Sequence, residues 1–405
     1  MYLLKRYGLT YLLAMLINIF AFATAKGQLY SFEFYNDTFN IALDSSISIP
    51  QKFGLNTESI ANVYDKLEKG NYQPIIDFLI SYKRKKQLND WLFYQLIRKT
   101  AETISPKKQN FERYTLYKWF FLGKSGYDTR LVITDNRIIM YVYNDENIFD
   151  IPYVMMGDKK YMCLNYHDYA HTNFTSIPDT EMIGIANSKK AFSYQITKMP
   201  EFDPKNYSER KLAFRYGMKD YHFDLKVSPE VEKIFKNYPG VDFKYYFNIP
   251  MTKETYGSLI PLLKKNISNL SQKNGVDYLM RFTRNSFLYE NDIENFGKEK
   301  RLSPEQTLLN EHSDCDDRAA LFFYLVKEIY DLPMIVLLYP THVTMAVQFN
   351  KPVGKTISYN NRDYTVCEPT PQIKDLPIGK LPPKLKRAAY EIVYAYEPEN
   401  KKGVL

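Results

Sequence analysis

The stretch SDCDDRAALFFYLVKEIYDLPMIVLLYPTHVTMAV, from Ser313 to Val347, has the pattern of one helix followed by two strands. After Cys315, apolar residues recur at helical spacing, namely Ala319, Phe322, Phe323, Val326, Ile329 and Tyr330. Met334–Tyr339 is a continuous apolar run, and a Pro-Thr turn separates it from an alternating run that begins at His342. The stretch therefore predicts a helix packed on antiparallel strands, the core of an α+β domain.

Cys315 is predicted to lie in the first turn of this helix. The N–H groups at a helix N-terminus stabilise a thiolate, whereas the nearby carboxylates of Asp314, Asp316 and Asp317 raise the pKa of a thiol. The same acids suit helix capping, with Ser313 or Asp314 as the N-cap residue. A reactive thiolate at Cys315 would therefore need a cationic partner.

A histidine and an acid are predicted to meet at one end of the sheet. His342 begins the alternating strand, and the later strand DYTVCE ends at Glu368. In an antiparallel pair the start of one strand lies beside the end of the other, so we expect Glu368 to neighbour His342. Cys315, His342 and Glu368 would then be the nucleophile, the base and the orienting acid of a covalent acyl-transfer enzyme.

These motifs together resemble the transglutaminase-like superfamily, whose core is a papain-like cysteine-protease fold. The resemblance covers about residues 276–375 and is carried by SDCDD, THVTMAV and CEPT, with SPEQTL upstream. It implies that Cys315 attacks an amide carbonyl to form a thioester, that His342 carries the proton, and that water or an amine resolves the thioester. The family usually has Asp where this chain has Glu368, which is one methylene longer.

Such a site also needs an oxyanion hole, made by the backbone N–H of Cys315 and a second donor. Gln306 is the candidate donor because it lies shortly upstream. The chemistry needs no cofactor and no metal ion. A metal site is the competing interpretation, but no second ligand cysteine or HExxH-like element supports it. Its ligands would be His312, Asp314, Cys315 and His342.

The cysteine count is odd, with Cys163, Cys315 and Cys367 in the chain. A disulfide between Cys315 and Cys367 would silence the proposed nucleophile. Strand alternation puts Cys367 on the face opposite Glu368, so we expect Cys367 to be a buried free thiol.

The N-terminus is predicted to direct export. Lys5 and Arg6 precede an apolar run that ends at Phe22, and Ala23-Thr24-Ala25 has the small residues of a signal-peptidase site. We expect residues 1–25 to be a removed signal peptide, because the run is short for a bilayer span of about 20 residues. An uncleaved anchor is the alternative. The mature protein would be secreted or periplasmic, without stable membrane insertion.

The charge pattern argues against nucleic-acid binding. The formal net charge is +8, and the basic clusters at residues 83–86 and 384–387 are short and lie in predicted surface helices. Solvated helix faces explain such clusters. We expect protein or peptide substrates as partners, with cell-wall peptides among the candidates.

The chain is predicted to contain three regions after the signal peptide. Residues 26–170 form a helical and αβ region, residues 171–250 a mainly β module, and residues 251–405 the transglutaminase-like catalytic domain. The element order of residues 111–164 parallels that of the catalytic stretch, with Cys163 opposite Cys367.

The first copy of this pattern is predicted to be degenerate. Asn110 or Phe111 stands in the place of Cys315, and Asn136 or Arg137 in the place of His342. If the repeat is real, that copy is structural, and the alternative is chance similarity of two αββ patterns.

The sequence thus predicts an exported cysteine peptidase, amidase or acyltransferase that acts on amide bonds, with hydrolysis favoured over cross-linking. The alternative is a non-catalytic peptide- or glycan-binding scaffold built on the same fold. The substitution of Glu for the usual Asp at position 368 is the feature that favours the alternative.

Overall fold

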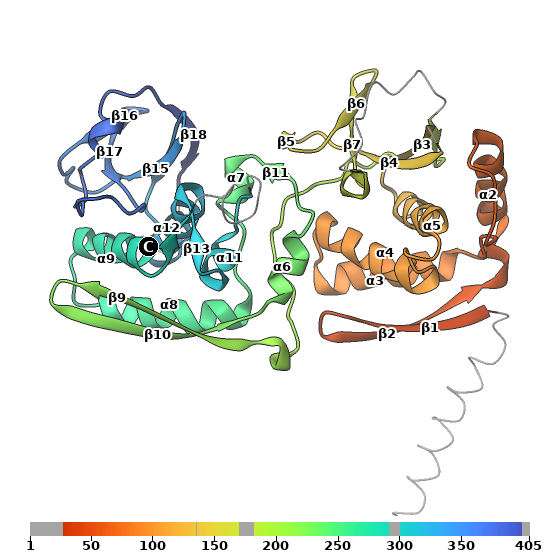
Figure 1. Ribbon diagram of the computed structural model, residues 1–405, viewed down its shortest axis with the longest axis horizontal. Helices are drawn as coiled ribbons and strands as arrows, with labels where there is room; N and C mark the ends of the chain where they lie inside the picture. The colour runs from red at the N-terminus through yellow and green to blue at the C-terminus, as the bar shows by residue number, and fades with distance from the viewer. Residues whose placement is uncertain (1–26, 135, 170–181, 291–299, 399–405) are drawn as a thin grey trace, which may run out of the picture. The chain divides into compact units, whose positions relative to one another are not determined.

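The computed structural model describes residues 27–134, 136–169, 182–290 and 300–398 and divides the chain into two compact units (Figure 1). The first unit comprises Met1–Gln87, Phe93–Asp145 and Pro152–Phe192, and the second comprises Leu88–Leu92, Glu146–Ile151 and Ser193–Leu405. The predicted signal peptide, residues 1–25, lies outside the described residues.

The first unit begins with a β-hairpin, continues with helices and ends with a sheet. The hairpin and a short 3-10 turn are β1 (Gly27–Phe34), β2 (Asp37–Asp44) and η1 (Ser45–Ile47). The helices are α2 (Thr57–Lys69), α3 (Gln73–Lys86), α4 (Asp90–Ile104) and α5 (Phe111–Lys124). These helices, with the sheet that follows them, agree with the helical and αβ region predicted within residues 26–170.

The sheet of the first unit has five antiparallel strands in the order β6-β7-β4-β3-β8. These strands are β3 (Thr129–Thr134), β4 (Arg137–Tyr143), β6 (Tyr153–Met156), β7 (Lys159–Cys163) and β8 (Ile183–Gly184). Between β4 and β6 lies β5 (Ile148–Phe149), and η2 (Tyr166–Asp168) follows β7.

The second unit also places a hairpin and helices before a central helix. Its elements before that helix are η3 (Pro204–Asn206), β9 (Ser208–Tyr216), β10 (Lys219–Val227), α6 (Glu230–Phe235), β11 (Gly240–Val241), α7 (Phe243–Tyr246), α8 (Lys253–Ile267), α9 (Gln272–Asn285), β12 (Leu288–Tyr289), α11 (Pro304–Leu309) and β13 (His312–Ser313). The central helix is α12 (Cys315–Tyr330), which begins at the predicted cysteine.

The second sheet follows α12 and is antiparallel, with the strand order β16-β17-β15-β14-β18. Its strands are β14 (Met334–Tyr339), β15 (His342–Val347), β16 (Thr356–Tyr359), β17 (Arg362–Cys367) and β18 (Glu391–Tyr396), with η4 (Pro383–Leu385) before β18. A helix packed on an antiparallel sheet is the α+β arrangement that the sequence predicts.

The two units repeat one topology. With β3 matched to β14 and β4 to β15, the strand orders of the two sheets are identical. Cys163, at the end of β7, faces Tyr141 of β4, and Cys367, at the end of β17, faces Met345 of β15. These parallels agree with the predicted repeat of elements, and a hairpin and helices also precede the central helix in both units.

The first copy lacks the three site residues at the matching positions. Asn110 caps α5 as Asp314 caps α12, so Phe111 takes the place of Cys315. Arg137 begins β4 where His342 begins β15, and Leu164 follows β7 where Glu368 follows β17. The candidate chemistry therefore belongs to the second copy.

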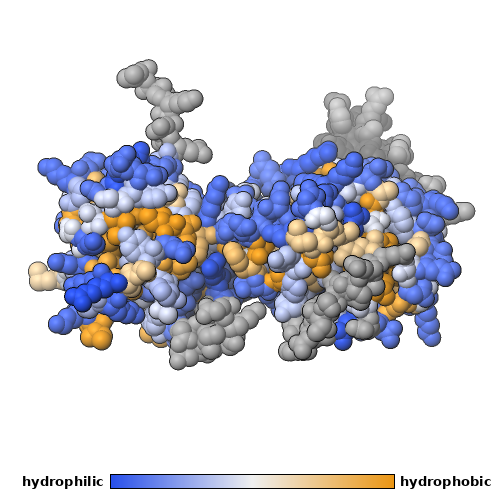
Figure 2. Space-filling model, turned by 90° about the horizontal axis from the view of Figure 1, so that it is seen from above, coloured by the Kyte–Doolittle hydropathy of each residue, from blue (hydrophilic) through white to orange (hydrophobic). Residues whose placement is uncertain are grey.

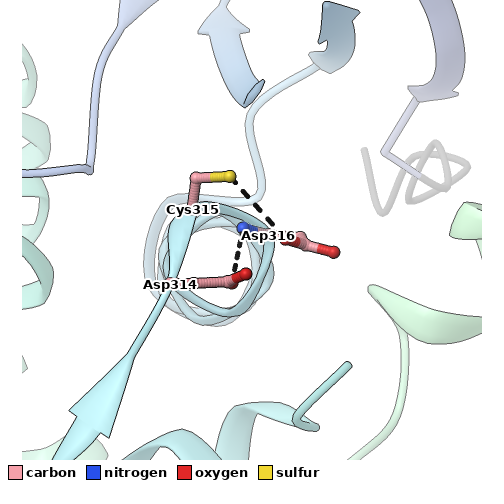
Figure 3. Close-up of side chains that lie close together, drawn as sticks. All are labelled: Asp314, Cys315 and Asp316. Carbon is pink, nitrogen blue, oxygen red and sulfur yellow. Dashed lines mark hydrogen bonds between the residues drawn. The ribbon is translucent and has the colours of Figure 1, made fainter. Parts of the chain in front are cut away.

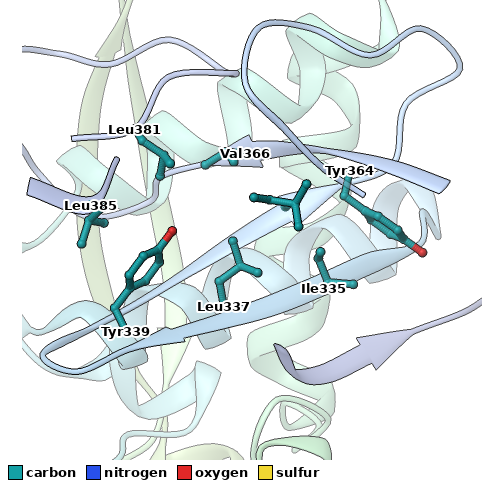
Figure 4. Close-up of a cluster of buried hydrophobic side chains, with 9 residues drawn as sticks. Ile335, Leu337, Tyr339, Tyr364, Val366, Leu381 and Leu385 are labelled. Carbon is teal, nitrogen blue, oxygen red and sulfur yellow. The ribbon is translucent and has the colours of Figure 1, made fainter. Parts of the chain in front are cut away.

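Helix α12 forms the centre of the second unit. It packs against α9, α11 and β15, and its residues from Asp317 to Val326 are buried on every side. The other face of the sheet is covered as well, because Leu381 and Leu385 pack over Leu337 and Val366 (Figure 4). Burial on both faces explains why β14 is a continuous apolar run.

The predicted β module at residues 171–250 is not a separate unit in the described residues. The apolar side chains of its hairpin, β9 and β10, pack on α8 and α9, and the Phe214 ring meets those of Tyr278 and Phe282. Near the end of the predicted module, Phe243–Tyr246 forms helix α7 instead of a strand. A hairpin has one apolar face to bury, and here α8 and α9 of the second unit cover it.

Apolar residues also reach the surface. On the second unit, at the left of Figure 2, hydrophobic residues gather among hydrophilic ones. Ile373 is fully exposed and Leu288 is 55% exposed. Among the residues that the structure describes, no helix combines the length and the apolar character needed to cross a bilayer.

Burial of α12 leads to a prediction about stability. Leu325→Ala should lower the free energy of unfolding by about 2–5 kcal/mol, because it leaves a cavity around a fully buried side chain. The matched control is Leu262→Ala in α8, whose side chain is 38% exposed and whose loss should cost less than about 1 kcal/mol. Urea unfolding measures both, and equal losses would contradict the central position of α12.

Candidate active site

The start of α12 is held by a capping box. The Asp314 carboxylate accepts a hydrogen bond from the backbone N–H of Asp316 at 3.1 Å (Figure 3). It accepts another from the backbone N–H of Asp317 at 3.3 Å. The Asp317 carboxylate in turn accepts one from the N–H of Asp314, at 3.4 Å. Two of the neighbouring acids therefore serve as caps, as the sequence predicts, and Cys315 occupies the first helical position.

A buried arginine fixes the first turn of α12 against the preceding elements. Arg318 is fully buried, and its guanidinium donates hydrogen bonds to backbone carbonyls at distances of 2.7–3.4 Å. The acceptors are the carbonyls of Thr283, Arg284, Phe287, Leu288 and Ser313. Burial lowers the pKa of Arg318 to about 10, opposed by the charge of Asp317, so the group stays charged at neutral pH.

The predicted histidine–acid pair is present. His342 Nε2 lies 2.8 Å from Glu368 Oε2, and both side chains are buried. The other carboxylate oxygen accepts a hydrogen bond from the N–H of Thr370 at 2.9 Å, and Arg284 donates to the Glu368 carbonyl. Because Glu368 takes Nε2, the imidazole has Nδ1 left for a second partner.

The thiol of Cys315 lies at the start of β15. It accepts a hydrogen bond from the backbone N–H of Val343, the residue that follows His342, and α12 packs against this strand. The fold therefore brings the thiol of Cys315 to the first residues of the strand that carries the His342–Glu368 pair. The structure therefore brings the three residues predicted to be catalytic to the same end of β15, and their catalytic role stays a prediction.

The electrostatics of the site keep the thiol protonated. Burial, followed by the charges of Asp316 and Asp314, raises the pKa of Cys315, and Glu368 adds to this effect. The Asp316 carboxylate lies 3.7 Å from Sγ. The hydrogen bond from the Val343 N–H lowers the pKa of Cys315, but by less than burial and the carboxylates raise it. Although Cys315 is at a helix N-terminus, a resting thiolate is therefore disfavoured.

Asp316 lies between the thiol and a cation. Its second carboxylate oxygen is 3.5 Å from Nε of Arg301, whose guanidinium lies over the ring of Phe243 at 4.3 Å. The ion pair orients the carboxylate that most strongly opposes ionisation of Cys315. Sequence reasoning missed Arg301, because a single arginine upstream of a capped helix carries no signal of its partner.

Gln306 has another role than the one predicted. Its side-chain oxygen accepts a hydrogen bond from the N–H of Ser303, which makes it the third residue of the capping box that begins α11. Its side-chain nitrogen donates to Glu232 at 3.0 Å. Since both ends of the amide have partners, we do not assign Gln306 to the oxyanion hole.

The predicted metal ligands are not assembled as a set of four. Ligand atoms of Asp314, Cys315 and Asp316 lie within 4.8 Å of one another. His342 is instead paired with Glu368, and His312 Nδ1 lies 3.6 Å from a carboxylate oxygen of Glu290. Three adjacent residues, two of them acids with capping or ion-pair roles, are a poor match to a structural zinc site.

All three cysteines are free thiols. Cys367 is completely buried, and its sulfur lies 3.6 Å from the carbonyl oxygen of Thr365. The predicted buried thiol at Cys367 is confirmed, and no disulfide blocks Cys315.

Sequence reasoning also missed Arg284 and Arg318. Most arginines are exposed to solvent, so the type of residue alone did not indicate a buried role for either one. For Arg318 a signal existed, since it lies between capping acids and a run of apolar residues in a helix that is buried all round. For Arg284 no signal existed, because its acceptor at Glu368 is distant in the chain.

The position of Asp316 leads to a second prediction. Asp316→Asn should lower the pKa of Cys315, since it removes a carboxylate and leaves the Arg301 cation nearby. Each unit of decrease raises the thiolate fraction at neutral pH about tenfold. The pH profile of alkylation by iodoacetamide measures this change. Asp363→Asn, an exposed position on β17, is the control, and an unchanged profile for Asp316→Asn would contradict the electrostatic account.

Comparison with known proteins does not identify a family for the chain. No protein-family model matches the chain, and no curated protein is significantly similar to it. A functional conclusion therefore depends on the arrangement of Cys315, His342 and Glu368.

Proposed function

We propose that the second unit is a cysteine-dependent acyl-transfer enzyme with a papain-like core of the transglutaminase-like type. The observation that carries the proposal is the buried His342–Glu368 pair, 2.8 Å apart, at the strand start where the Cys315 thiol lies. Buried ionisable pairs are costly unless the fold compensates them, so such a pair beside a helix-terminal thiol supports a catalytic role.

The proposed reaction begins with a protonated thiol. As the sulfur attacks the carbonyl carbon of an amide, its proton passes to His342, and the imidazolium is stabilised by Glu368. The backbone N–H of Cys315 is the candidate donor to the oxyanion, because the Asp314 side chain takes the N–H groups of Asp316 and Asp317. His342 then protonates the leaving amine, and a thioester remains.

Water resolves the thioester in the proposed hydrolytic route. His342 accepts a proton from water, which attacks the thioester carbonyl, and the thiol of Cys315 recovers its proton as it leaves. A primary amine in place of water would give transamidation. The raised pKa of Cys315 favours this general-base route over a preformed thiolate–imidazolium pair.

The proposed cellular setting follows from the N-terminal sequence. Residues 1–25 are proposed to direct export, which would place the enzyme outside the cytoplasm or in the cell envelope. Proteins, peptides and cell-wall peptides are the proposed substrates, because each offers amide bonds to an exported thiol enzyme.

A second candidate is a scaffold that binds peptides or glycans without turnover. Two observations favour it, namely the raised pKa of Cys315 and the glutamate at position 368. The two candidates differ in whether His342 activates the thiol, which is directly measurable.

Thiol activation is tested by alkylation. In the wild-type protein at pH 7, iodoacetamide should modify Cys315 at least about tenfold faster than in His342→Ala, because the imidazole accepts the proton during attack. Mass spectrometry identifies the labelled cysteine. His222→Ala, an exposed histidine on β10, should behave as wild type. Equal rates in wild type and His342→Ala would favour the scaffold.

Turnover is tested with glutamine peptides. Wild-type protein should release ammonia or cleave the peptide, and Cys315→Ala should do neither. Glu368→Gln should reduce the rate by about 100-fold, since removal of the orienting charge in a triad costs about that much or more. Glu368→Asp should give an intermediate rate because its carboxylate is one methylene further from His342. Incorporation of an added primary amine would identify transamidation, and full activity of Glu368→Gln would refute the role of Glu368.

A further inference from the structure

A polar pocket of about 690 Å³ lies next to the segment that follows Glu368. Its walls come from the tip of the β9–β10 hairpin, from α9, and from residues 371–375. The charged residues that line it are Arg215, Asp277, Arg281, Arg284 and Asp375. The volume is in the range of pockets that bind small ligands or several residues of a peptide.

The pocket is built around two arginines of α9. Arg281 and Arg284 are three positions apart and lie on one helix face. Both contact the carboxylate of Asp375, one on each oxygen. Although partial burial opposes its ionisation, Arg281 and Arg284 lower the pKa of Asp375. The pocket thus already holds a carboxylate in a two-arginine site.

The position of the Asp375 carboxylate allows a carboxylate of a ligand to replace it. Asp375 has a side chain that is 53% exposed and lies in a segment that forms neither helix nor strand. Arg215 is paired with Asp220, and Arg281 is paired with Asp277 as well as with Asp375. If Asp375 left, Arg284 and one side of Arg281 would be open to another carboxylate. Arg284, only 3% exposed, also has a buried Nε without a hydrogen-bond partner, so an unused donor remains.

One of these arginines, Arg284, connects the pocket to the candidate active site. Arg284 donates to the backbone carbonyl of Glu368 and, at 3.0 Å, to that of Leu376. The pocket wall at residues 371–375 is therefore the direct continuation of the residue that orients His342. Arg284 is thus shared by the pocket and by the segment that carries Glu368.

We propose that the pocket binds a carboxylate of the peptide substrate, which displaces Asp375 from Arg281 and Arg284. This inference relies on the proposed function for the identity of the ligand as a peptide. The planar guanidinium groups of arginines bind carboxylates well. The contacts of Asp375 show how a carboxylate is held between Arg281 and Arg284. The carboxylate is either a C-terminal one or an acidic side chain near the amide that Cys315 attacks.

The test measures binding to the full-length Cys315→Ala protein, so no turnover is needed. Calorimetric titration compares acetyl-Ala-Gln-Gly as free acid and as amide, and acetyl-Ala-Gln-Glu-amide with acetyl-Ala-Gln-Gln-amide. In at least one pair the charged peptide should bind about tenfold more tightly. The pair that responds shows whether the terminal or the side-chain carboxylate is recognised.

Two further substitutions should act in opposite directions. Arg281→Gln should abolish the preference for the charged peptide, and Asp375→Asn should tighten its binding several-fold because the resident carboxylate is gone. Arg362→Gln removes an exposed arginine outside the pocket and should leave the preference intact. Thermal unfolding checks that each variant is folded.

The outcomes separate this inference from the proposed function. Equal binding within both pairs, a preference that survives Arg281→Gln, or unchanged binding to Asp375→Asn would overturn the carboxylate site, even if Cys315 turns over peptides. Charge-dependent binding without turnover by the wild-type protein would support the site and overturn the catalytic proposal.

Discussion

The buried guanidinium of Arg318 organises the second unit. It brings together the end of α9, the strand β12 and the start of α12, which would otherwise leave carbonyl groups buried without donors. A buried charge is tolerated only when hydrogen bonds satisfy it, and here five backbone carbonyls do so. Because Cys315 begins the same helix turn, the position of its thiol depends on this cation. A lysine could not replace it, since a single ammonium cannot reach all these acceptors.

The chemistry of the site is set by a balance of charges. Helix position and the Val343 N–H favour a thiolate at Cys315, whereas burial and nearby carboxylates disfavour it, and the second group is stronger. His342 Nε2 lies 2.8 Å from Glu368 Oε2 at the same end of the sheet. Burial contributes most to the raised pKa of Cys315, and Asp316, which is paired with Arg301, is the charge that contributes most.

The internal repeat shows which parts of the pattern are structural. Both units keep the capped central helix, the strand order of the sheet and a buried cysteine at the end of the matching strand. Only the second has Cys315, His342 and Glu368 at the matching positions. Since the first unit forms the same topology with Phe111, Arg137 and Leu164 there, the fold does not require the triad residues.

The sequence alone determined the helix from Cys315, the strands on either side of His342, and the neighbouring position of Glu368, because periodicity and capping are local properties of the chain. It also indicated the repeat through the order of its elements. The role of Gln306, the partners of Arg284, Arg301 and Arg318, and the inclusion of residues 193–250 in the second unit were decided only by tertiary structure. Each of these features depends on contacts between residues that are distant in the chain. Packing decides whether a polar side chain faces solvent or a buried partner, and this leaves no local pattern in the sequence.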